Sequence, residues 1–490
     1  MRLQALFPID PAIAAAHGDL EIAGLTADSR KVKPGFLFAA LKGVAAHGRD
    51  FVADAKARGA AAVLSGGDLH GDPGLPHIVS ANPRADFAWA ASEFYPRRPD
   101  TIVAVTGTNG KSSTVDFLRQ IWAHSGKRGA SMGTLGAIWD GQMRDLGHTT
   151  ADPVQVHETL QMLADEGVTH LAMEASSHGL EQHRLDAVRL KAAAFTNLTQ
   201  DHLDYHATME SYRAAKLKLW GLLSPRSFAI VNADSPEAPA FSRAAEAQGH
   251  KLVECGWRAH EPTGLKISEI LPHPNGQTLK LRWRHEDYDV ELPLIGEFQA
   301  LNAVCAAALA LSLGDAPEAV FAAMETLKPV KGRIEHVGAT EDGAHVFVDY
   351  AHTPDGLNVL LRAARPHAPG RIILVFGCGG DRDKGKRAKM GAEAAKFADV
   401  AIVTDDNPRT EDAGAIRRMV LEAVPGALEI ADRGAAIREG VKMLKKGDAL
   451  LIAGKGHETG QIVGAQIIPF SDQDEARAAL STRAKERAHA

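Results

Sequence analysis

The residues best suited to chemistry lie in one glycine-rich segment, Thr106–Ser113, which reads Thr-Gly-Thr-Asn-Gly-Lys-Ser-Ser and follows the apolar stretch Thr101–Val105. Glycines let a backbone turn tightly and aim several N–H groups at one anion, and a following helix adds its dipole. Lys111 supplies a charge for terminal phosphates, and Ser112 offers a hydroxyl to Mg²⁺. Val105 stands where the general pattern has its first glycine, so the loop is a variant. The predicted ATP-binding residues here are Gly107, Thr108, Asn109, Gly110, Lys111, Ser112 and Ser113.

Metal-ligand candidates follow two other apolar stretches. Glu174 comes directly after Thr169–Met173, where a carboxylate beside a phosphate loop is placed to hold Mg²⁺, although a solvated glutamate would look the same. His202 and His206 are four residues apart, as in a zinc pair on one helix face. No third ligand has an indicative spacing and oxygen donors outnumber nitrogens, which favours magnesium. Lys216, from the residues alone, is an ordinary helix lysine.

Composition restricts the class of protein. The chain has 490 residues, 45% hydrophobic and 24% charged, with a net charge of −6, which is typical of folded domains. The mild acidity argues against a broad nucleic-acid groove. Three scattered cysteines exclude a disulfide framework and fit a reducing compartment. The first residues lack a signal-peptide core and no apolar run spans a bilayer, so we expect a cytoplasmic protein without a membrane partner.

Short apolar stretches alternate with amphipathic ones along most of the chain, which predicts an α/β fold with mostly parallel sheets. Prolines near Tyr95–Pro99 and the segment Lys328–Arg333 mark boundaries. We therefore expect three domains, 1–98, 99–333 and 334–490. Leu279–Trp283 and Tyr288–Leu294 alternate apolar and polar residues, which predicts an antiparallel insertion or edge. The charged, Ala-rich end, 474–490, predicts a surface helix that frays.

Several segments together resemble the Mur ligase family over essentially the whole chain. They are 107–112 (GTNGKS), 174–180 (EASSHGL), 197–204 (NLTQDHLD), 350–355 (YAHTPD), 377–385 (GCGGDRDKG), 406–409 (DNPR) and 454–458 (GKGHE). The resemblance implies an N-terminal UDP-sugar domain, a central P-loop ATPase domain and a C-terminal Rossmann-like domain. It implies an ATP-dependent ligase of peptidoglycan precursor synthesis, in which an acyl phosphate made from ATP is attacked by an amine.

The resemblance also assigns roles to residues in the catalytic centre. Lys216 matches a carbamylated lysine (N6-carboxylysine), and a carbamate can bridge magnesium as a bare ammonium cannot. His202 and Glu174 match magnesium ligands, with Lys111 and Lys216 completing the catalytic set. Further ATP-binding positions are Asn302, Arg333, Asp349 and His352.

The resemblance places the UDP-N-acetylmuramoyl-dipeptide on two groups of residues. The uridine and diphosphate group contains Ala27, Ser29, Val44, Ala45 and Ala46. The muramoyl-dipeptide group contains Thr149, Thr150, Ser176, Gln182 and Arg184. Ala27 departs from the leucine expected there. Arg184 suits an anionic substrate, but an arginine on a solvated loop is the alternative.

The incoming amine is indicated by the C-terminal segments, which match Arg382, Asp406, Asn407, Pro408, Arg409, Gly454 and Glu458 to amino-acid contacts. Arg409 has the planar fork for the extra carboxylate of meso-diaminopimelate. Lysine-adding relatives resemble this segment but lack the arginine, so the resemblance favours diaminopimelate over L-lysine. A surface pair of Arg409 with Asp406 or Glu411 is the alternative.

Other functions remain open from the sequence. These are a lysine-adding ligase, another ligase such as folylpolyglutamate synthetase or the D-alanyl-D-alanine-adding relative, and a nonenzymatic dinucleotide-binding module prompted by Gly377–Gly380. The segment Gly377–Gly380 lacks the third glycine of the G-x-G-x-x-G motif of dinucleotide-binding modules, because Arg382 stands at that position. We further expect small-molecule substrates, no nucleic-acid partner and a monomeric state.

Overall fold

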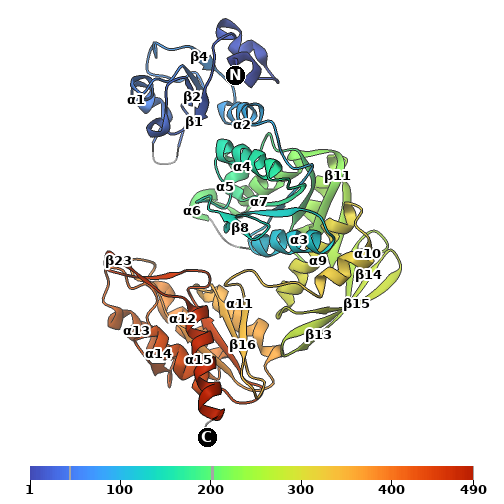
Figure 1. Cartoon of the computed structure of the whole chain (residues 1–490), viewed down its shortest axis with the longest axis vertical. Helices are drawn as coiled ribbons and strands as arrows, with labels where there is room; N and C mark the ends of the chain where they lie inside the picture. The colour runs from blue at the N-terminus through green and yellow to red at the C-terminus, as the bar shows by residue number, and fades with distance from the viewer. Residues whose placement is uncertain (44–45, 200–202, 489–490) are drawn as a thin grey trace. The chain divides into compact units, whose positions relative to one another are not determined.

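The computed structural model describes residues 1–43, 46–199 and 203–488, and it has the α/β architecture that the sequence predicts (Figure 1). The chain divides into two compact units. Residues 1–266 with 304–320 form unit 1, and residues 267–303 with 321–490 form unit 2. Helix α9, Glu297–Ser312, contributes residues to both. The division into three domains at residues 98 and 333 stays a prediction.

Unit 1 begins with a small parallel sheet whose strands run in the order β1-β2-β3-β4 within the described residues. Its elements are β1 (Gly24–Thr26), β2 (Phe36–Ala39), α1 (Val52–Ala57), β3 (Ala62–Ser65), β4 (His77–Val79) and α2 (Pro83–Phe94). Helix α2 starts where the Asn82 side chain accepts a hydrogen bond from Ala85 N and Pro83 takes the first position.

A larger sheet follows in unit 1, with the strand order β12-β11-β10-β5-β9-β6-β7-β8. Its strands are β5 (Thr101–Thr106), β6 (Gly129–Gly133), β7 (Gly136–Trp139), β8 (Gln142–Arg144), β9 (His170–Glu174), β10 (Leu190–Phe195), β11 (Leu223–Asn232) and β12 (Lys251–Gly256). The helices between them are α3 (Lys111–His124), α4 (Pro153–Asp165), α5 (Ser177–Glu181), α6 (Leu203–His206), α7 (Met209–Leu217) and α8 (Ala238–Ala247).

Strand β5 is central to this sheet, and all of its residues are buried because it is apolar on both faces. It runs parallel to β9 and β10, with Val105 opposite Glu174 and Thr106 opposite Phe195. The carboxyl ends of three strands therefore meet where the chain enters the glycine-rich loop, as ligand sites in α/β sheets require.

In unit 2, β14 (Gly276–Trp283) and β15 (Glu286–Leu292) form the predicted antiparallel pair, after β13 (Leu265–His273). A second sheet has the order β16-β17-β21-β18-β19-β20 in the part of the chain that the structure describes. Its strands are β16 (Glu335–Ala339), β17 (His345–Asp349), β18 (Ile372–Phe376), β19 (Val400–Val403), β20 (Leu428–Glu429) and β21 (Ala449–Ala453). Further elements are α10 (Pro317–Met324, shared with unit 1), α11 (Pro354–Ala364), α12 (Gly385–Phe397), α13 (Ala413–Leu421), α14 (Arg433–Met443), the hairpin β22 (Gly460–Val463) and β23 (Gln466–Pro469), and α15 (Asp472–Ala488).

The C-terminal helix that the sequence predicts is present as α15, and its residues 481–487 are exposed or half-buried, but it is anchored at its start. The first turn of α15 is buried: Asp472 is fully enclosed and forms an ion pair of 2.7 Å with Arg433 of α14, while Ala476 and Ala479 enter the apolar core. A buried pair of this kind is costly to break from one side, so it anchors α15 to α14.

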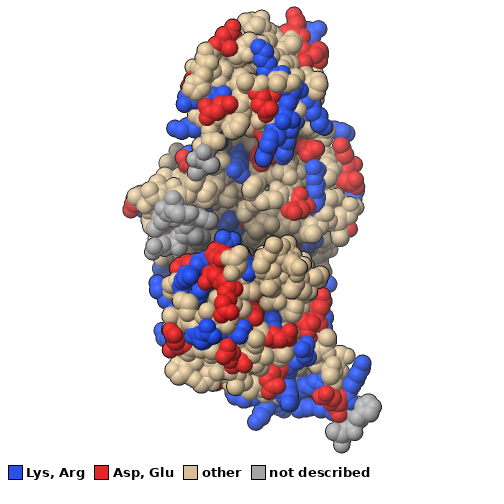
Figure 2. Space-filling view, turned by 90° about the vertical axis from the view of Figure 1, so that its left-hand side faces the viewer, with Lys and Arg blue, Asp and Glu red and all other residues tan. Residues whose placement is uncertain are grey.

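No helix in the described part of the chain is both long and apolar enough to cross a membrane. Acidic and basic side chains are interspersed on the face that Figure 2 shows. That distribution agrees with the small net charge of the sequence.

Candidate functional site

The glycine-rich loop connects β5 to α3 and is held against the end of β10. Gly107 and Gly110 have φ angles of +153° and +85°, and a Cβ at Gly107 would lie 1.9 Å from Thr196 Oγ1. Thr196 Oγ1 donates to Asn109 O at 2.6 Å, and Asn109 N donates to Asn197 Oδ1 at 3.0 Å. The glycines are therefore required by backbone conformation and by close approach.

Lys111 folds back over this loop from the first turn of α3. Its ammonium donates to Gly107 O at 2.9 Å and to Thr108 O at 2.8 Å. The charge thus sits over the loop, at the N-terminus of a helix of 14 residues. Backbone amides, a helix dipole and an ammonium together form a cradle for phosphate groups.

Glu174 and Ser112 meet beside the loop, as the sequence predicts. Ser112 Oγ donates to Glu174 Oε1 at 2.9 Å, and the same oxygen accepts from Thr134 N at 2.8 Å. A Cβ at Gly133 would lie 2.1 Å from Glu174 Oε1, so the missing side chain makes room for the carboxylate. Glu174 is 2% exposed. A hydroxyl and a buried carboxylate are oxygen ligands that suit Mg²⁺.

Lys216 of α7 reaches the same loop from another part of the chain. It is 1% exposed, donates from Nζ to Gly107 O at 2.8 Å and lies 4.5 Å from the centre of the Tyr212 ring. Lys111 and Lys216 thus contact one carbonyl oxygen. His202, which the sequence offers as a further ligand, lies outside the described residues.

The residues predicted to bind the muramoyl dipeptide lie close to Glu174 and to one another. Thr150 Oγ1 donates to Glu174 O at 3.1 Å and accepts from Ser176 N at 3.0 Å. Arg184 donates to Thr150 O at 2.6 Å and to Gln182 Oε1 at 2.9 Å. Arg184 is half-buried in this network rather than on a solvated loop. Thr149 joins the cluster because its hydroxyl lies 3.0 Å from that of Thr134.

One further cation belongs to this region, although the sequence analysis does not find it. Arg84, in the first turn of α2, donates to the carbonyl of Lys42. Burial is the main cause that lowers the pKa of both Arg84 and Arg184, and the charge of Arg84 lowers that of Arg184 further against the opposing effect of Asp152. Two guanidinium groups that share a half-buried environment are suited to an anionic ligand. No motif surrounds Arg84, so only the fold places it here.

The predicted uridine residues are less organised in the structure. Ser29 is buried, whereas Ala27 and Ala46 are exposed. Val44 and Ala45 lie outside the described residues. The role of this group stays a prediction.

The remaining ATP candidates lie in unit 2. Asp349, at the end of β17, accepts from Ile334 N and Ala351 N, both at 2.7 Å, and burial raises its pKa against the effect of these amides. Arg333 stacks on the Tyr350 ring with 5.0 Å to its centre, and His352 Nδ1 bonds Tyr350 O at 2.8 Å. The structure therefore brings Arg333, Asp349 and His352 together. Asn302 is buried, with Nδ2 3.5 Å from Gln299 Oε1, and Gln299 in turn donates to Arg333 O.

Arg409 and its neighbours form a loop after β19. Arg409 has φ +54°, and its guanidinium donates to Gly380 O at 2.8 Å. Glu411, the alternative partner, instead pairs with Arg387 at 2.8 Å, which lowers the pKa of Glu411 to about 2. Among the described residues Arg409 has no ion pair. Its charge is therefore available to a carboxylate.

The other predicted amino-acid contacts surround this loop. Asp406, Asn407 and Pro408 are buried, Glu458 is half-buried and Arg382 is exposed. A Cβ at Gly454 would lie 2.5 Å from Asp406 Oδ2, and one at Gly380 would lie 1.9 Å from Pro408 O. Glycine at these positions lets the motifs pack against the loop.

Lys455 ties these residues together and is missed by the sequence analysis. Its ammonium, fully buried, donates to Asn407 Oδ1 at 2.9 Å and to Glu458 Oε2 at 3.1 Å. Asn407 Nδ2 also donates to Glu458 Oε2 at 2.9 Å. The amide of Ile462 in the β22–β23 hairpin completes the set by donating to Asn407 Oδ1. This network fixes the orientation of Asn407 and Glu458 before any ligand is present.

A phosphate-binding loop at the carboxyl ends of parallel strands, beside a buried carboxylate, defines a nucleotide-dependent α/β enzyme. Three family models match the chain: "Mur ligase family, catalytic domain" over 21–92, "Mur ligase middle domain" over 105–310 and "Mur ligase, glutamate ligase domain" over 332–456. The chain belongs to the Mur ligase family. The expected family, fold class and enzymatic nature are therefore confirmed.

Curated relatives are similar over nearly the whole chain. UDP-N-acetylmuramoyl-L-alanyl-D-glutamate–2,6-diaminopimelate ligase of Rhizobium meliloti is 51% identical over 462 residues, covering 94% of each chain. The protein of the same name from Caulobacter vibrioides is 51% identical over 470 residues, covering 94% of this chain and 96% of its own.

Solved structures of Mur ligases are also similar to this chain. One of a UDP-N-acetylmuramoyl-L-alanyl-D-glutamate–2,6-diaminopimelate ligase has a TM-score of 0.77 and 32% identity, covering 99% of both chains. MurF ligase from Thermotoga maritima in complex with ADP has a TM-score of 0.61 at 16% identity, covering 96% of this chain and 99% of its own, which supports the fold.

Proposed function

We propose that this chain adds meso-2,6-diaminopimelate to the D-glutamate of UDP-N-acetylmuramoyl-L-alanyl-D-glutamate, consuming ATP, in peptidoglycan precursor synthesis. The observation that carries the proposal is Arg409, a half-buried guanidinium without an ion pair among the described residues, in a chain 51% identical to two ligases of that name. The products are the tripeptide, ADP and phosphate.

A carboxylate is a poor electrophile, so the D-glutamate carboxylate first takes the γ-phosphoryl group and ADP departs. The amine then attacks the acyl carbon, the C–O bond to phosphate breaks, and the amine loses a proton. Lys111 and the loop amides stabilise charge on the transferring group. Water must be excluded while the acyl phosphate exists.

Magnesium, when bound, supplies further charge neutralisation. Glu174 and Ser112 are the described residues whose oxygens would hold it, and His202 would add a ligand. The meeting of Ser112 Oγ and Glu174 Oε1 at 2.9 Å supports this donor set.

Lys216 acts as its carbamate. Two ammonium groups that contact Gly107 O repel one another in a buried site, and carbamylation would replace one positive charge by a negative one. The new carboxylate-like group would face the loop and serve magnesium as an additional oxygen ligand.

Arg84 and Arg184 bind the diphosphate and muramoyl end of the nucleotide-sugar substrate, with Thr149, Thr150, Ser176 and Gln182 around them. Burial, and after it the charge of Arg84, lowers the pKa of Arg184, which supports this role because a bound anion would stabilise the charged guanidinium. Ala27, Ser29, Val44, Ala45 and Ala46 contact the uridine end.

Arg409 binds the distal carboxylate of diaminopimelate, and Glu458 binds the distal ammonium. Arg382, Asp406, Asn407, Pro408 and Gly454 shape the rest of this site. L-Lysine lacks the distal carboxylate and would leave the guanidinium of Arg409 unpaired. Asn302, Arg333, Asp349 and His352 contact ATP. We expect the protein to act as a monomer in the cytoplasm.

The decisive experiment measures phosphate release by the purified protein with ATP, Mg²⁺ and UDP-N-acetylmuramoyl-L-alanyl-D-glutamate, adding either meso-diaminopimelate or L-lysine. We expect release that depends on both substrates and a large preference for meso-diaminopimelate. A preference for lysine would overturn the proposed amine, and release that needs no amine would overturn ligation.

A further inference from the structure

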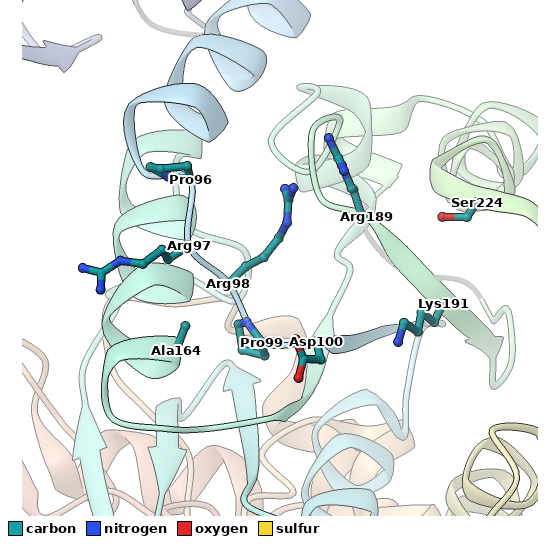
Figure 3. A pocket seen from close by; sticks show the side chains of 9 residues that line it. All are labelled: Pro96, Arg97, Arg98, Pro99, Asp100, Ala164, Arg189, Lys191 and Ser224. Carbon is teal, nitrogen blue, oxygen red and sulfur yellow. The ribbon is translucent and has the colours of Figure 1, made fainter. Parts of the chain in front are cut away.

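A second basic region lies away from the phosphate loop. It is a pocket of about 580 Å³ in unit 1, within the range of small-ligand sites. Its lining residues are Pro96, Arg97, Arg98, Pro99, Asp100, Ala164, Arg189, Lys191 and Ser224 (Figure 3). Four cationic side chains and one carboxylate line the pocket, although the chain as a whole is acidic.

The pocket lies at the opposite end of the sheet from the nucleotide loop. Asp100 precedes the first residue of β5 and Lys191 is the second residue of β10, whereas Gly107 follows the last residue of β5. A strand of this length spans about 20 Å. A ligand in this pocket therefore does not share the phosphate loop.

The basic side chains differ in how they are neutralised. Arg97 pairs with Asp165 at 2.7 Å and points away from the others in Figure 3. Lys191 donates only to a neutral group among the described residues, Thr101 Oγ1 at 3.3 Å. Arg189 has no ion pair or hydrogen bond from its side chain in the described part of the chain.

Arg98 and Arg189 extend to the same side of the pocket in Figure 3. Burial is the first cause that lowers the pKa of Arg98, and the charge of Arg189 is the second, against the weaker effect of Glu93. The Nη1 of Arg98 lies 3.5 Å from Ser92 Oγ, a weak contact. Neither guanidinium forms an ion pair among the described residues, so the two groups repel one another, an arrangement that an anion would stabilise.

The backbone holds Arg98 in place before binding. Pro96 and Pro99 flank Arg97 and Arg98 in the sequence, and Pro99 is buried. Because proline fixes its own φ and restricts the residue before it, little backbone entropy is lost when Arg98 binds a ligand.

We propose that this pocket binds a compact, multiply charged phosphate anion of the pyrophosphate class. Arg98 and Arg189 bind the phosphate oxygens through their planar forks, Lys191 adds a point charge, and the Ser224 hydroxyl adds a hydrogen bond. The anion is either inorganic pyrophosphate or the diphosphate of a nucleotide, which share this chemistry.

The test is calorimetric titration of the full chain with sodium pyrophosphate at low ionic strength and without divalent metal. A Lys111→Ala background weakens binding at the phosphate loop, and in it we compare Arg98→Gln/Arg189→Gln with the control Arg243→Gln/Arg258→Gln. Arg243 and Arg258 are exposed residues of unit 1 outside the pocket, so the control removes the same charge.

We expect saturable binding in the Lys111→Ala protein, at least a tenfold loss of affinity in the pocket variant and less than a twofold change in the control. Absence of saturable binding, or equal affinity in the pocket variant and the control, would overturn the proposal. ADP that competes with pyrophosphate would support a nucleotide diphosphate as the ligand, and ADP that does not compete would support the inorganic anion. In the Lys111→Ala background, the Arg98→Gln/Arg189→Gln variant should have the same melting temperature as the control variant, which separates lost binding from lost folding.

Discussion

The phosphate loop of unit 1, Thr106–Ser113, and the Asp406–Arg409 loop of unit 2, which we propose binds the amino acid, hold their charged groups differently. In the phosphate loop, the ammonium groups of Lys111 and Lys216 contact backbone carbonyls, and neighbouring chain segments fix the loop. In the Asp406–Arg409 loop, hydrogen bonds between side chains fix their orientation, because Lys455 bridges Asn407 and Glu458. Backbone cradles suit phosphate, which every nucleotide carries, whereas a side-chain network suits a choice between two similar amino acids.

The largest effect should come from breaking the first loop. Lys111→Ala should lower the ligation rate by roughly 10³-fold, because a charge that stabilises the transferring phosphoryl group is lost. Phosphate release with both substrates measures the rate. Binding of the UDP-sugar substrate, measured by calorimetry, should persist. Loss of that binding together with activity would show that the protein is misfolded and would contradict a specific role.

Lys216 tests whether the second lysine at the Gly107 carbonyl acts through its carbamate. Lys216→Ala should reduce ligation by about 10³-fold, since charge stabilisation in the site is lost. Short carboxylic acids should restore part of the rate, and bicarbonate should have no effect on this variant. Lys218→Ala, two residues further along the chain and exposed, is the control. Near-normal turnover of Lys216→Ala would refute the carbamate.

Arg409 is the corresponding test in unit 2. Arg409→Ala should raise KM and lower kcat/KM for meso-diaminopimelate by about 10²-fold, because a charged hydrogen-bonded contact is lost. The preference over L-lysine should shrink by a similar factor, while UDP-sugar binding stays unchanged. Initial rates with each amine give both values, and Arg418→Ala is an exposed control. An unchanged preference would place the distal carboxylate elsewhere.

The comparison also separates what the sequence could predict from what it could not. The phosphate loop is local, since strand, glycines, Lys111 and helix are consecutive, and the structure has them in that order. Glu174 could be placed because the carboxyl ends of parallel strands meet at one edge. The motif at Asp406–Arg409 could be located, but not the hydrogen bond of Arg409 with Gly380 O.

Contacts between residues far apart in the chain escape such reasoning. Lys455 lies 48 residues from Asn407, and Arg433 lies 39 residues from Asp472, so no spacing relates either pair. The surface helix expected over 474–490 is present as α15, but its charged composition gave no indication that Asp472, just before that range, is buried against α14. Arg84 is similar, since its charge acts on the pKa of Arg184 from 100 residues away in the chain.

The smallest effect should come from Lys455, which we propose acts only by positioning. Lys455→Met keeps the length of the side chain but removes the ammonium, so Asn407 and Glu458 lose a shared donor. We expect KM for meso-diaminopimelate to rise by about tenfold with kcat nearly unchanged, because residues behind a binding group typically contribute that much. Lys455→Arg should recover part of the affinity, and Lys446→Met, an exposed lysine, should resemble the wild type. A fall in kcat with unchanged KM would instead place the Lys455 charge at the reacting atoms and remove the contrast between the two loops.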